Sequence, residues 1–569
     1  MEKTKKSQDM GDFEEEDLGE GDQFLAVRPW KGQMKPPTGF KRAQKGAGEA
    51  PGIKLELDWV HGYKGDQAKN NLKYMADGTL AYYIAGVGVV YDPETHKQRF
   101  FQEHTDDVTC MDFHPDLVHC LTGENGRKPV AYIWDSVTCQ PKHRLVGNGI
   151  THTITACAFS VSGKFALLVA GNDDHCMAVY DTQSGACVAK GKGVRNNVIE
   201  AKWKDDSTFC LVGSKLFCEV TICNGSFNKV NGKFGNNDQR IGSLAFNGTQ
   251  ALTGNIKNEI YVWEGTNIVK VVKLDLGRLV DAITVTQDYV FFGDRDKKIH
   301  VCDKQYKILW VANLHEFERT KKCNDAQVRA IACDSRHSKL FVGTYGHEII
   351  ELPINMPNRR VIWDNARTVI NGHYAPRNDW TNELWGLTIF NQSDKYVTCS
   401  DDGKVKIWDA VKHELIKSIS LTLDKKGENI EMDPHYKNLS KEMQGRAVDI
   451  HPKGALIAVG MNDGTLRVFE SYHNDWRLVY TGRQGKEWIE DLKFSPDGQF
   501  LAVSGHDNKI QMFEVPGLKK IGKPFGASSS FITHLDWSLD SRYIRTNDGS
   551  YEILYYSVEK GEQIKNGAS

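Results

Sequence analysis

The feature that most constrains the fold of this 569-residue chain is a strand ending that recurs along it. An aromatic residue followed by an acidic one closes an apolar run at Tyr91-Asp92, Trp134-Asp135, Tyr180-Asp181, Trp263-Glu264, Trp408-Asp409, Phe469-Glu470 and Phe513-Glu514. Weaker endings continue the series at Cys223-Asn224, Cys302-Asp303, Glu351-Leu352 and Tyr556-Ser557. Most intervals are about 40 to 49 residues, which is close to the length of a four-stranded propeller blade. The series predicts about eleven such units.

The segments between these endings are those of an all-β protein. From residue 53 onward, short runs of Val, Ile, Phe and Tyr alternate with turn clusters, and tight Asp-Gly turns such as Asp402-Gly403 punctuate them. No stretch keeps a helical period. Eleven units fill one closed ring of about seven blades and leave about four, so we expect two tandem propellers, the second short or incomplete. An open row of strands would expose unpaired backbone groups, which predicts a docking edge.

Composition and motifs narrow the class of function. The formal net charge is -2 and the sequence pI is about 6.8, so no bulk attraction to nucleic acid or to an anionic membrane is expected. No run of about 18 apolar residues predicts a membrane span. The chain has no P-loop, no GxSxG elbow and no HExxH, and its 19 histidines are scattered. We therefore expect no enzyme activity, no cofactor and no metal.

Residues 55–92 carry a family resemblance. Leu55, Leu57, Trp59, Gly62, Tyr63, Gly65 and Asn71, followed by Tyr82-Tyr83-Ile84-Ala85, resemble the HELP motif of the EMAP-like (echinoderm microtubule-associated protein-like) family. The resemblance implies tandem propellers with the motif packed in their core, and tubulin as partner. Read without it, the alternation of Leu55, Leu57 and Trp59 predicts one face of a strand in a core blade.

A second resemblance concerns the unit from Gly372-His373 to Trp408-Asp409, the most complete of the series. It is similar to a WD repeat, in which a loop His, a strand Ser or Thr, a turn Asp and a strand Trp share hydrogen bonds. The matching residues are His373, Ser400, Asp401 or Asp402, and Trp408. The resemblance implies that these residues have a structural role.

The domain organisation follows from charge and spacing. Residues 1–22 are acidic and predict a disordered start. Residues 23–51 predict a basic extended strap, residues 52–410 the HELP motif with the first propeller, 411–443 a linker or long loop, and 444–569 the second propeller. The strap contains the candidate microtubule-binding cations Arg28, Lys31, Lys35, Lys41, Arg42 and Lys45. Its alternative is a solvated linker.

The functional expectation combines the fold with the resemblance. It is a non-enzymatic structural or scaffold protein that binds tubulin or microtubules through propeller surfaces, in the cytoplasm and cytoskeleton, with the axoneme of a cilium as the expected place. Other axonemal proteins are expected to complete the second propeller, and neither nucleic acid nor membrane is an expected partner. The alternative is a general WD-repeat adaptor, such as a substrate receptor of a ubiquitin ligase or a trafficking scaffold, because propellers host many functions.

Overall fold

The computed structural model describes residues 52–274, 278–321, 323–375, 383–423, 443–473, 475–526 and 528–564. The strands within these ranges form eleven antiparallel sheets. Ten are meanders of four neighbours in chain order, and one has five strands, of which the last pairs with the third. One α-helix lies in the same ranges, α1 at His315–Lys321, together with a short 3-10 turn, η3, at Trp363–Asn365. The expectation of an all-β fold with about eleven units is confirmed.

Seven sheets come from the first two thirds of the chain. Their strands are β1 Lys73–Tyr74, β2 Leu80–Ile84, β3 Val87–Asp92, β4 Lys97–Phe101; β5 Val108–Phe113, β6 His119–Glu124, β7 Ala131–Asp135, β8 Pro141–Leu145; β9 Ile154–Phe159, β10 Phe165–Ala170, β11 Met177–Asp181, β12 Cys187–Gly191; β13 Glu200–Trp203, β14 Thr208–Gly213, β15 Leu216–Cys223, β16 Ser226–Asn231; β17 Ile241–Asn247, β18 Gln250–Asn255, β19 Glu259–Glu264, β20 Asn267–Lys273; β21 Val280–Val285, β22 Tyr289–Asp294, β23 Lys298–Asp303, β24 Ile308–Asn313; and β25 Val328–Cys333, β26 Lys339–Thr344, β27 Ile349–Asn355, β28 Arg360–Val361, β29 Arg367–Ile370.

Four more sheets follow. Their strands are β30 Leu384–Ile389, β31 Lys395–Ser400, β32 Lys404–Asp409, β33 Glu414–Ser420; β34 Gly445–Ile450, β35 Leu456–Met461, β36 Thr465–Tyr472, β37 Asp475–Arg483; β38 Ile489–Phe494, β39 Phe500–Gly505, β40 Ile510–Glu514, β41 Lys519–Phe525; and β42 Ile532–Trp537, β43 Tyr543–Asp548, β44 Ile553–Ser557, β45 Glu562–Ile564.

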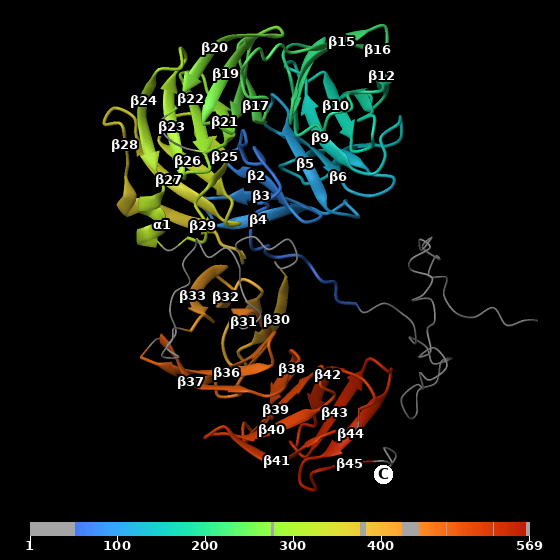
Figure 1. The fold of residues 1–569 in the computed structure, drawn as a ribbon, viewed down its shortest axis with the longest axis vertical. Helices are drawn as coiled ribbons and strands as arrows, with labels where there is room; N and C mark the ends of the chain where they lie inside the picture. Colours follow the sequence, from blue (N-terminus) through green and yellow to red (C-terminus); the bar gives the residue numbers. More distant parts are fainter. Residues whose placement is uncertain are drawn as a thin grey trace, which may run out of the picture.

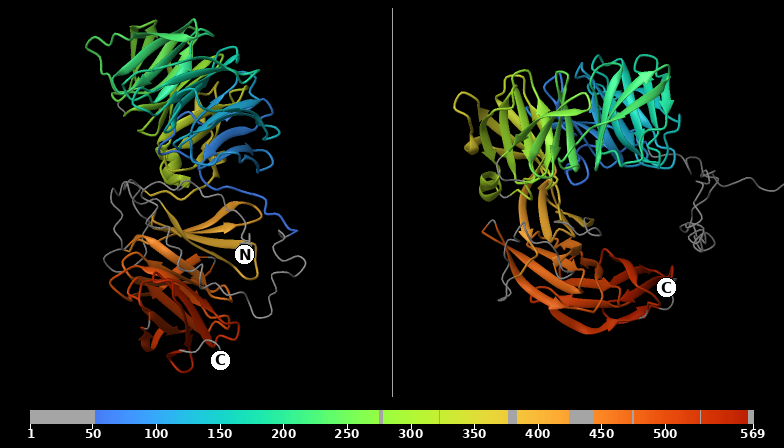
Figure 2. Two further views of the ribbon diagram at one scale, coloured as in Figure 1. Left: turned by 90° about the vertical axis from the view of Figure 1, so that its right-hand side faces the viewer. Right: turned by 45° about the horizontal axis from the view of Figure 1, so that its top comes forward.

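The first seven sheets form a ring, because the seventh packs against the first. Leu80, Tyr82 and Tyr91 of the first sheet share one buried cluster with Phe341 and Ile349 of the seventh. Central strands such as β10 are buried on both faces, which explains their nearly continuous apolar runs. Figure 1 shows these sheets, coloured blue to yellow, at one end of an elongated molecule, and Figure 2 shows the same ring from two other sides.

The last four sheets stack in a row at the other end of the molecule (Figure 1). The inner strand of each one packs on its predecessor: β34 on β30, β38 on β34 and β42 on β38. Within the described residues this second region has four sheets, in agreement with the expected short or incomplete propeller.

Two expectations need correction. Residue 410, the expected end of the first propeller, lies inside one sheet. It is in the turn between β32 and β33, which pair with each other from Lys404 opposite Ser420 to Asp409 opposite Glu414. That sheet packs on β34, so the second region begins before Leu384, and the expected linker 411–443 contains strand β33. Residues 424–442 of that linker lie outside the described ranges.

The second correction concerns the start of the HELP-like stretch. Residues 53–72 belong to no strand, and the Leu55 side chain is fully exposed. The alternation of Leu55, Leu57 and Trp59 is therefore not the face of a strand, because an apolar alternation forms a strand only where a neighbouring strand pairs with it.

Candidate functional site

Residues 58–72, here called the threading segment, join the two regions and cross the first ring. Its first residues lie between the first sheet and the sheet β30–β33. The Val60 N–H donates to Gln98 Oε1 of β4 at 2.8 Å, and the Gln98 amide donates to the Val60 carbonyl at 3.1 Å. On the other side, Trp59 stacks on His413, with ring centroids 4.6 Å apart and planes 3° apart.

His61 continues this junction between the regions. Its ring lies 4.1 Å from that of Trp408, and its Nε2 lies 2.6 Å from the Tyr396 hydroxyl oxygen. Burial, together with the neighbouring His413, Lys406, His373 and His96, lowers the pKa of His61 to about 3. The imidazole is therefore neutral at physiological pH.

Three matching HELP residues next fit the segment onto the seventh sheet. Gly62 has a φ of +93° and donates its N–H to the Asn371 carbonyl at 2.9 Å. A Cβ on Gly65 would lie 1.8 Å from the Thr344 carbonyl oxygen, so only glycine fits there. Tyr63 is fully buried and covers Gly343, and its hydroxyl donates to Asn71, itself buried.

A buried ionic cluster then holds the segment in the channel of the ring. Arg329 of β25 donates to the Gly65 carbonyl at 2.6 Å and pairs with Asp281 of β21. Lys69 reaches the same carboxylate at 2.7 Å, and Arg295 reaches it at 2.6 Å. Burial would raise the pKa of Asp281, but the three cations outweigh it and hold that pKa at about 2. The cluster ties the segment to two inner strands.

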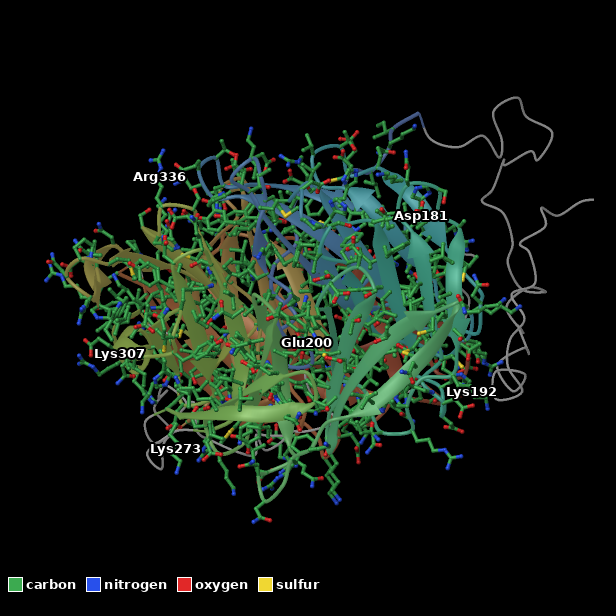
Figure 3. The ribbon with its side chains drawn as sticks, turned by 90° about the horizontal axis from the view of Figure 1, so that it is seen from above. Asp181, Lys192, Glu200, Lys273, Lys307 and Arg336 are labelled. Atoms are coloured by element: carbon green, nitrogen blue, oxygen red, sulfur yellow. The ribbon has the colours of Figure 1, made fainter. Side chains whose placement is uncertain are left out.

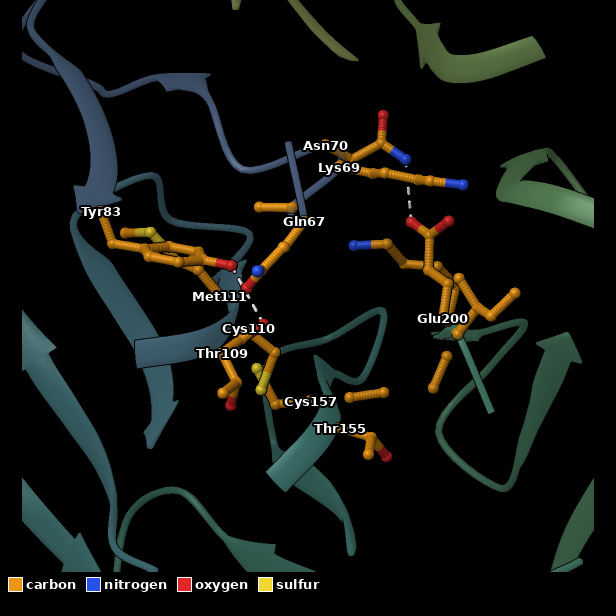
Figure 4. Close-up of a pocket in the computed structure, with 15 residues that line it drawn as sticks. Gln67, Lys69, Asn70, Tyr83, Thr109, Cys110, Met111, Thr155, Cys157 and Glu200 are labelled. Atoms are coloured by element: carbon orange, nitrogen blue, oxygen red, sulfur yellow. Dashed lines mark hydrogen bonds between the residues drawn. The ribbon is translucent and has the colours of Figure 1, made fainter. Parts of the chain in front are cut away.

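Asn70 reaches the opposite side of the channel. Its amide donates to Glu200 of β13 at 2.9 Å, and Glu200 in turn accepts from the Leu244 N–H at 2.8 Å. Burial raises the pKa of Glu200. Figure 4 shows the small cavity beside this contact, bounded by Tyr83, Cys110, Cys157 and Glu200. Its volume of about 110 Å³ has room for water but is smaller than an ordinary ligand pocket.

The WD-like residues form a hydrogen-bonded set. His373 Nδ1 lies 2.8 Å from Asp402 Oδ2, and its Nε2 lies 2.7 Å from Thr398 Oγ1. The Trp408 indole donates to the same Thr398 hydroxyl at 2.8 Å. The strand hydroxyl is thus that of Thr398, while Ser400 accepts from the Asp402 N–H in the turn.

The second sheet contains an equivalent set that the sequence analysis missed. His104 contacts Glu124 at 2.8 Å and Thr122 at 2.7 Å, and Trp134 donates to Thr122 at 3.1 Å. Glutamate takes the place of the turn aspartate, which hid the pattern. Both sets satisfy buried polar groups at a blade edge, a structural role.

The only His/Asp group of metal-ligand spacing in the described part of the chain lies in the β5–β6 turn: His114, Asp116 and His119. Asp116 already accepts from the Val118 and His119 N–H groups at 2.8 and 3.0 Å, and His114 Nε2 contacts the Gly163 carbonyl at 3.1 Å. The two bonds to Asp116 are those of a tight turn, and the contact of His114 joins this turn to the next sheet.

One side of the first ring is rich in exposed cations, and we call it the basic loop face. Its cations lie on the loops that join sheets two to six and on their central hairpins: Arg127, Lys128, Lys192, Arg195, Lys215, Arg240, Lys257, Lys273 and Arg278. The described carboxylates on the same loops and hairpins are Asp173, Asp174, Asp238 and Asp296, and Glu103, Asp106 and Asp107 lie on the loop that joins sheets one and two. Figure 3 shows Lys192 and Lys273 on this side and Asp181 and Arg336 on the other.

Part of this charge is paired and part is not. Lys192 pairs with Asp174 at 2.7 Å, and Arg240 pairs with Asp238 at 2.6 Å. Arg195, Lys215 and Lys273 form no salt bridge with any described residue. No single segment of the sequence marks this face, because its cations are dispersed over about 150 residues; the available signal was their recurrence in the loops between sheets and in the central hairpins.

The predicted strap cations Arg28, Lys31, Lys35, Lys41, Arg42 and Lys45 lie outside the described residues. Of the HELP residues, the structure brings Trp59, Gly62, Tyr63, Gly65 and Asn71 into the threading segment, whereas Leu55 and Leu57 lie apart on the surface. In the described ranges, no helix has the length and apolar character needed to cross a membrane.

Comparison with known proteins agrees with this architecture. Family models match residues 50–89 as the HELP motif, 97–352 as "Echinoderm microtubule-associated protein first beta-propeller" and 384–569 as its second beta-propeller. The chain is 28% identical to the ciliary WD repeat-containing protein ctxp80 of Euplotoides octocarinatus, over all of this chain and 78% of that protein.

Mammalian relatives have a similar identity. Echinoderm microtubule-associated protein-like 2 of Mus musculus is 29% identical over 91% of this chain and 76% of its own length. Echinoderm microtubule-associated protein-like 1 of Homo sapiens is 30% identical over 91% of this chain and 60% of its own length. With its HELP segment threaded through a seven-sheet ring and a second propeller behind it, this chain belongs to the echinoderm microtubule-associated protein-like family.

Proposed function

We propose that this protein is a non-enzymatic structural component that binds tubulin in microtubules through the basic loop face of its first ring. The observation that carries the proposal is the excess of exposed cations on that face, with Arg195, Lys215 and Lys273 lacking a salt-bridge partner among the described residues. The outer surface of a microtubule is acidic, so opposite charges would steer and orient the encounter. The microtubule-associated names of the relatives support the same partner.

The cilium is the place we propose for this protein, within the cytoplasmic cytoskeleton. The support is the relative named as a ciliary protein, which matches along the whole of this chain. Localisation of a tagged full-length protein in a ciliated cell tests this part: signal along the axoneme supports it, and a cell body signal with unlabelled cilia contradicts it.

Co-sedimentation with taxol-stabilised microtubules tests the binding surface. The variant R195E/K215E/K273E replaces three positive charges by three negative ones, and we expect its affinity to fall by roughly tenfold or more. Binding of the unsubstituted protein should also weaken as salt rises, because exposed charges are screened. Equal pelleting of the variant and the unsubstituted protein would contradict the basic loop face.

The matched control is K164E/K307E/R336E, which reverses three exposed cations in the β9–β10, β23–β24 and β25–β26 turns, at the opposite ends of the strands from the basic loop face. It makes the same change in net charge and should bind almost normally. A third variant replaces Arg28, Lys31, Lys35, Lys41, Arg42 and Lys45 by Ser and reports on the strap independently. If the unsubstituted protein did not pellet with microtubules, the alternative function of a general WD-repeat adaptor would be favoured.

A further inference from the structure

The turn between β5 and β6 brings two imidazoles to one carboxylate oxygen. His114 Nδ1 lies 2.9 Å from Asp116 Oδ2, and His119 Nδ1 lies 2.7 Å from the same oxygen. The three atoms all lie within 4.8 Å of one another. The side chains of His114, Asp116 and His119 are 20%, 36% and 22% exposed, so the group is partly buried yet can be reached from solvent.

The hydrogen bonds of His114 determine which of its ring nitrogens carries the proton. Its Nε2 lies 3.1 Å from the Gly163 carbonyl oxygen, which accepts but cannot donate, so Nε2 is the N–H. The Asp116 backbone N–H donates to Nδ1 at 3.2 Å, so Nδ1 carries the lone pair. This lone pair also faces the Asp116 carboxylate, at 2.9 Å from Oδ2. Two electron-rich atoms at that distance repel each other, and a bound cation between them would turn the repulsion into attraction.

The equivalent turn of the second region shows that the fold alone does not need this arrangement. In the turn between β34 and β35, His451 Nε2 lies 3.0 Å from the Gly498 carbonyl oxygen, and its Nδ1 accepts from the Lys453 N–H at 3.1 Å. His451 therefore contacts the next sheet as His114 does. The places of the carboxylate and of the second imidazole are taken there by Lys453 and by Leu456, the first residue of β35. The carboxylate and the second imidazole are thus additions to a turn that forms without them.

Two of the three side chains are oriented by hydrogen bonds outside the group, as metal ligands in proteins are. A ligating histidine usually donates its other ring N–H to a carboxylate, a backbone carbonyl or water. His114 donates to Gly163, and a Cβ on this glycine would lie 2.0 Å from His114 Nε2, so glycine leaves the room for that contact. Asp116 Oδ1 accepts from the Val118 and His119 N–H groups at 2.8 and 3.0 Å, which directs Oδ2 toward the imidazoles.

We propose that His114, Asp116 and His119 bind a divalent transition-metal ion of the zinc type through the two Nδ1 atoms and Asp116 Oδ2. Two imidazoles and one carboxylate suit Zn²⁺, and three protein ligands leave a fourth position for water. Tetrahedral zinc at about 2.1 Å from each ligand keeps the ligand atoms roughly 3.3 Å apart, so shifts of roughly half an ångström complete the geometry. The expectation of no metal rested on scattered histidines, and these two meet only when the turn folds.

The site does not depend on the proposed microtubule surface. The β5–β6 turn has the same place in its sheet as the β9–β10 turn, at the opposite ends of the strands from the basic loop face. An ion held there ties β5 to β6 and stabilises the second sheet, because it binds the folded chain in preference to the unfolded one. Loss of zinc binding should leave pelleting with microtubules unchanged, so each of the two proposals can fail without the other.

Zinc titration of the chelator-treated full chain tests the site. Isothermal titration calorimetry with Zn²⁺ alone should show one ion per chain, and H119Q and D116N should each lower its affinity by roughly tenfold or more. D116N keeps an oxygen for the turn hydrogen bonds, which protects the fold. In thermal unfolding, zinc should raise the Tm of the unsubstituted protein and of neither variant. No zinc binding, or binding that both variants retain, overturns the proposal.

A matched control separates the metal from the structural role of the histidine. H451A removes the contact with Gly498 in the equivalent turn but no proposed ligand, so it should lower the Tm and leave the zinc affinity unchanged. H114A should lower both. If H451A weakens zinc binding as much as H114A does, the effect comes from general loss of structure and the proposal is wrong.

Cobalt tests whether cysteines bind the metal instead. The chain has 13 cysteines, and thiolate ligands add a sulfur-to-metal charge-transfer band to the spectrum of bound Co²⁺, whereas imidazole and carboxylate ligands do not. We expect d–d absorption without that band, and its loss in D116N. A thiolate-type spectrum that D116N leaves unchanged would place the metal elsewhere and overturn the assignment.

Discussion

The two regions of this molecule are built from the same four-stranded unit but differ at their ends. In the first, the seventh sheet packs against the first, and Tyr63 and Leu72 of the threading segment lie in the shared cluster. In the second, the end strands β30 and β44 present Leu387 and Ile553 to the surface. The repeat builds junctions between successive sheets in both regions, and among the described residues the first and last sheets meet only in the first region.

The junction that closes the first ring includes a segment outside the repeat. The inner strand of the first sheet, β1, has only two residues, Lys73–Tyr74. Tyr63 takes up the space above Gly343 of the seventh sheet, where even a Cβ would lie 2.3 Å from the tyrosine ring. The threading segment therefore fills part of the junction between the first and the seventh sheets.

The largest effect is expected from removing the Arg329 guanidinium, which holds the threading segment in the first ring. Arg329→Ala leaves Asp281 buried with fewer cations and frees the Gly65 and Asp66 carbonyls. We expect the first ring to lose about 3–5 kcal/mol of stability, as when one partner of a buried ion pair is removed. Denaturant unfolding followed by hydrogen exchange would locate the loss in sheets one, six and seven.

Arg319→Ala is the control for that change. Its side chain is exposed on α1 and pairs only with Glu316 among the described residues, at 2.9 Å, so its loss should cost under about 1 kcal/mol. Equal effects of the two arginine variants would show that the ionic cluster does not hold the ring closed.

A matched pair of leucines compares a filled junction with an open one. Leu492 and Leu387 occupy equivalent register positions, but the first is buried and the second exposed. Leu492→Ala should cost about 2–5 kcal/mol, and Leu387→Ala under about 1 kcal/mol in dilute solution. Equal costs of the two variants would mean that the face of β30 is not exposed in solution.

The sequence predicted the repeated unit well because its signal is local. The aromatic-acid endings coincide with the ends of the third strands, as at Trp408-Asp409 in β32 and Phe513-Glu514 in β40. The number of sheets and the shortness of the second region followed from counting them. The course of the HELP stretch could not be predicted, because its contacts join residues more than 250 positions apart. Tyr63 packs on Gly343, and Gly65 binds Arg329.

The boundary between the regions was also beyond the sequence pattern. Sheet β30–β33 carries the most complete WD-like set, yet nothing in its residues states whether it packs on the sheet before or after it. The three-dimensional contact of Gly386 with Val448 settles the question in favour of the second region. The basic loop face was hidden for the same reason, since it gathers single residues from several repeats.

The hydrogen-bonded sets around Thr122 and Thr398 should contribute similar stability, because they have the same geometry in the two regions. Thr122→Val in the first ring and Thr398→Val in the second each leave a tryptophan N–H and a histidine nitrogen without their hydroxyl partner. Each should cost about 1–3 kcal/mol, the penalty for unsatisfied buried polar groups. Hydrogen exchange should place each loss in its own region; a loss spread over both would indicate that they unfold as one unit.

The smallest effect concerns the junction that joins the regions, and it depends on pH. Since the pKa of His61 is lowered to about 3 in the folded protein, the unfolded chain binds a proton at a higher pH, near 6.5. Stability from this group is therefore complete above about pH 6.5 and is lost progressively as the pH falls toward 3, by about 1 kcal/mol between pH 7 and 5.5.

His61→Gln keeps an acceptor for the Tyr396 hydroxyl but does not titrate, so its unfolding free energy should vary less with pH over this range. His96, which also lies at this junction and whose pKa burial likewise lowers, contributes in the same direction, and H96Q measures its share. If the H61Q protein keeps the full pH dependence, the coupling between the two regions does not run through this imidazole.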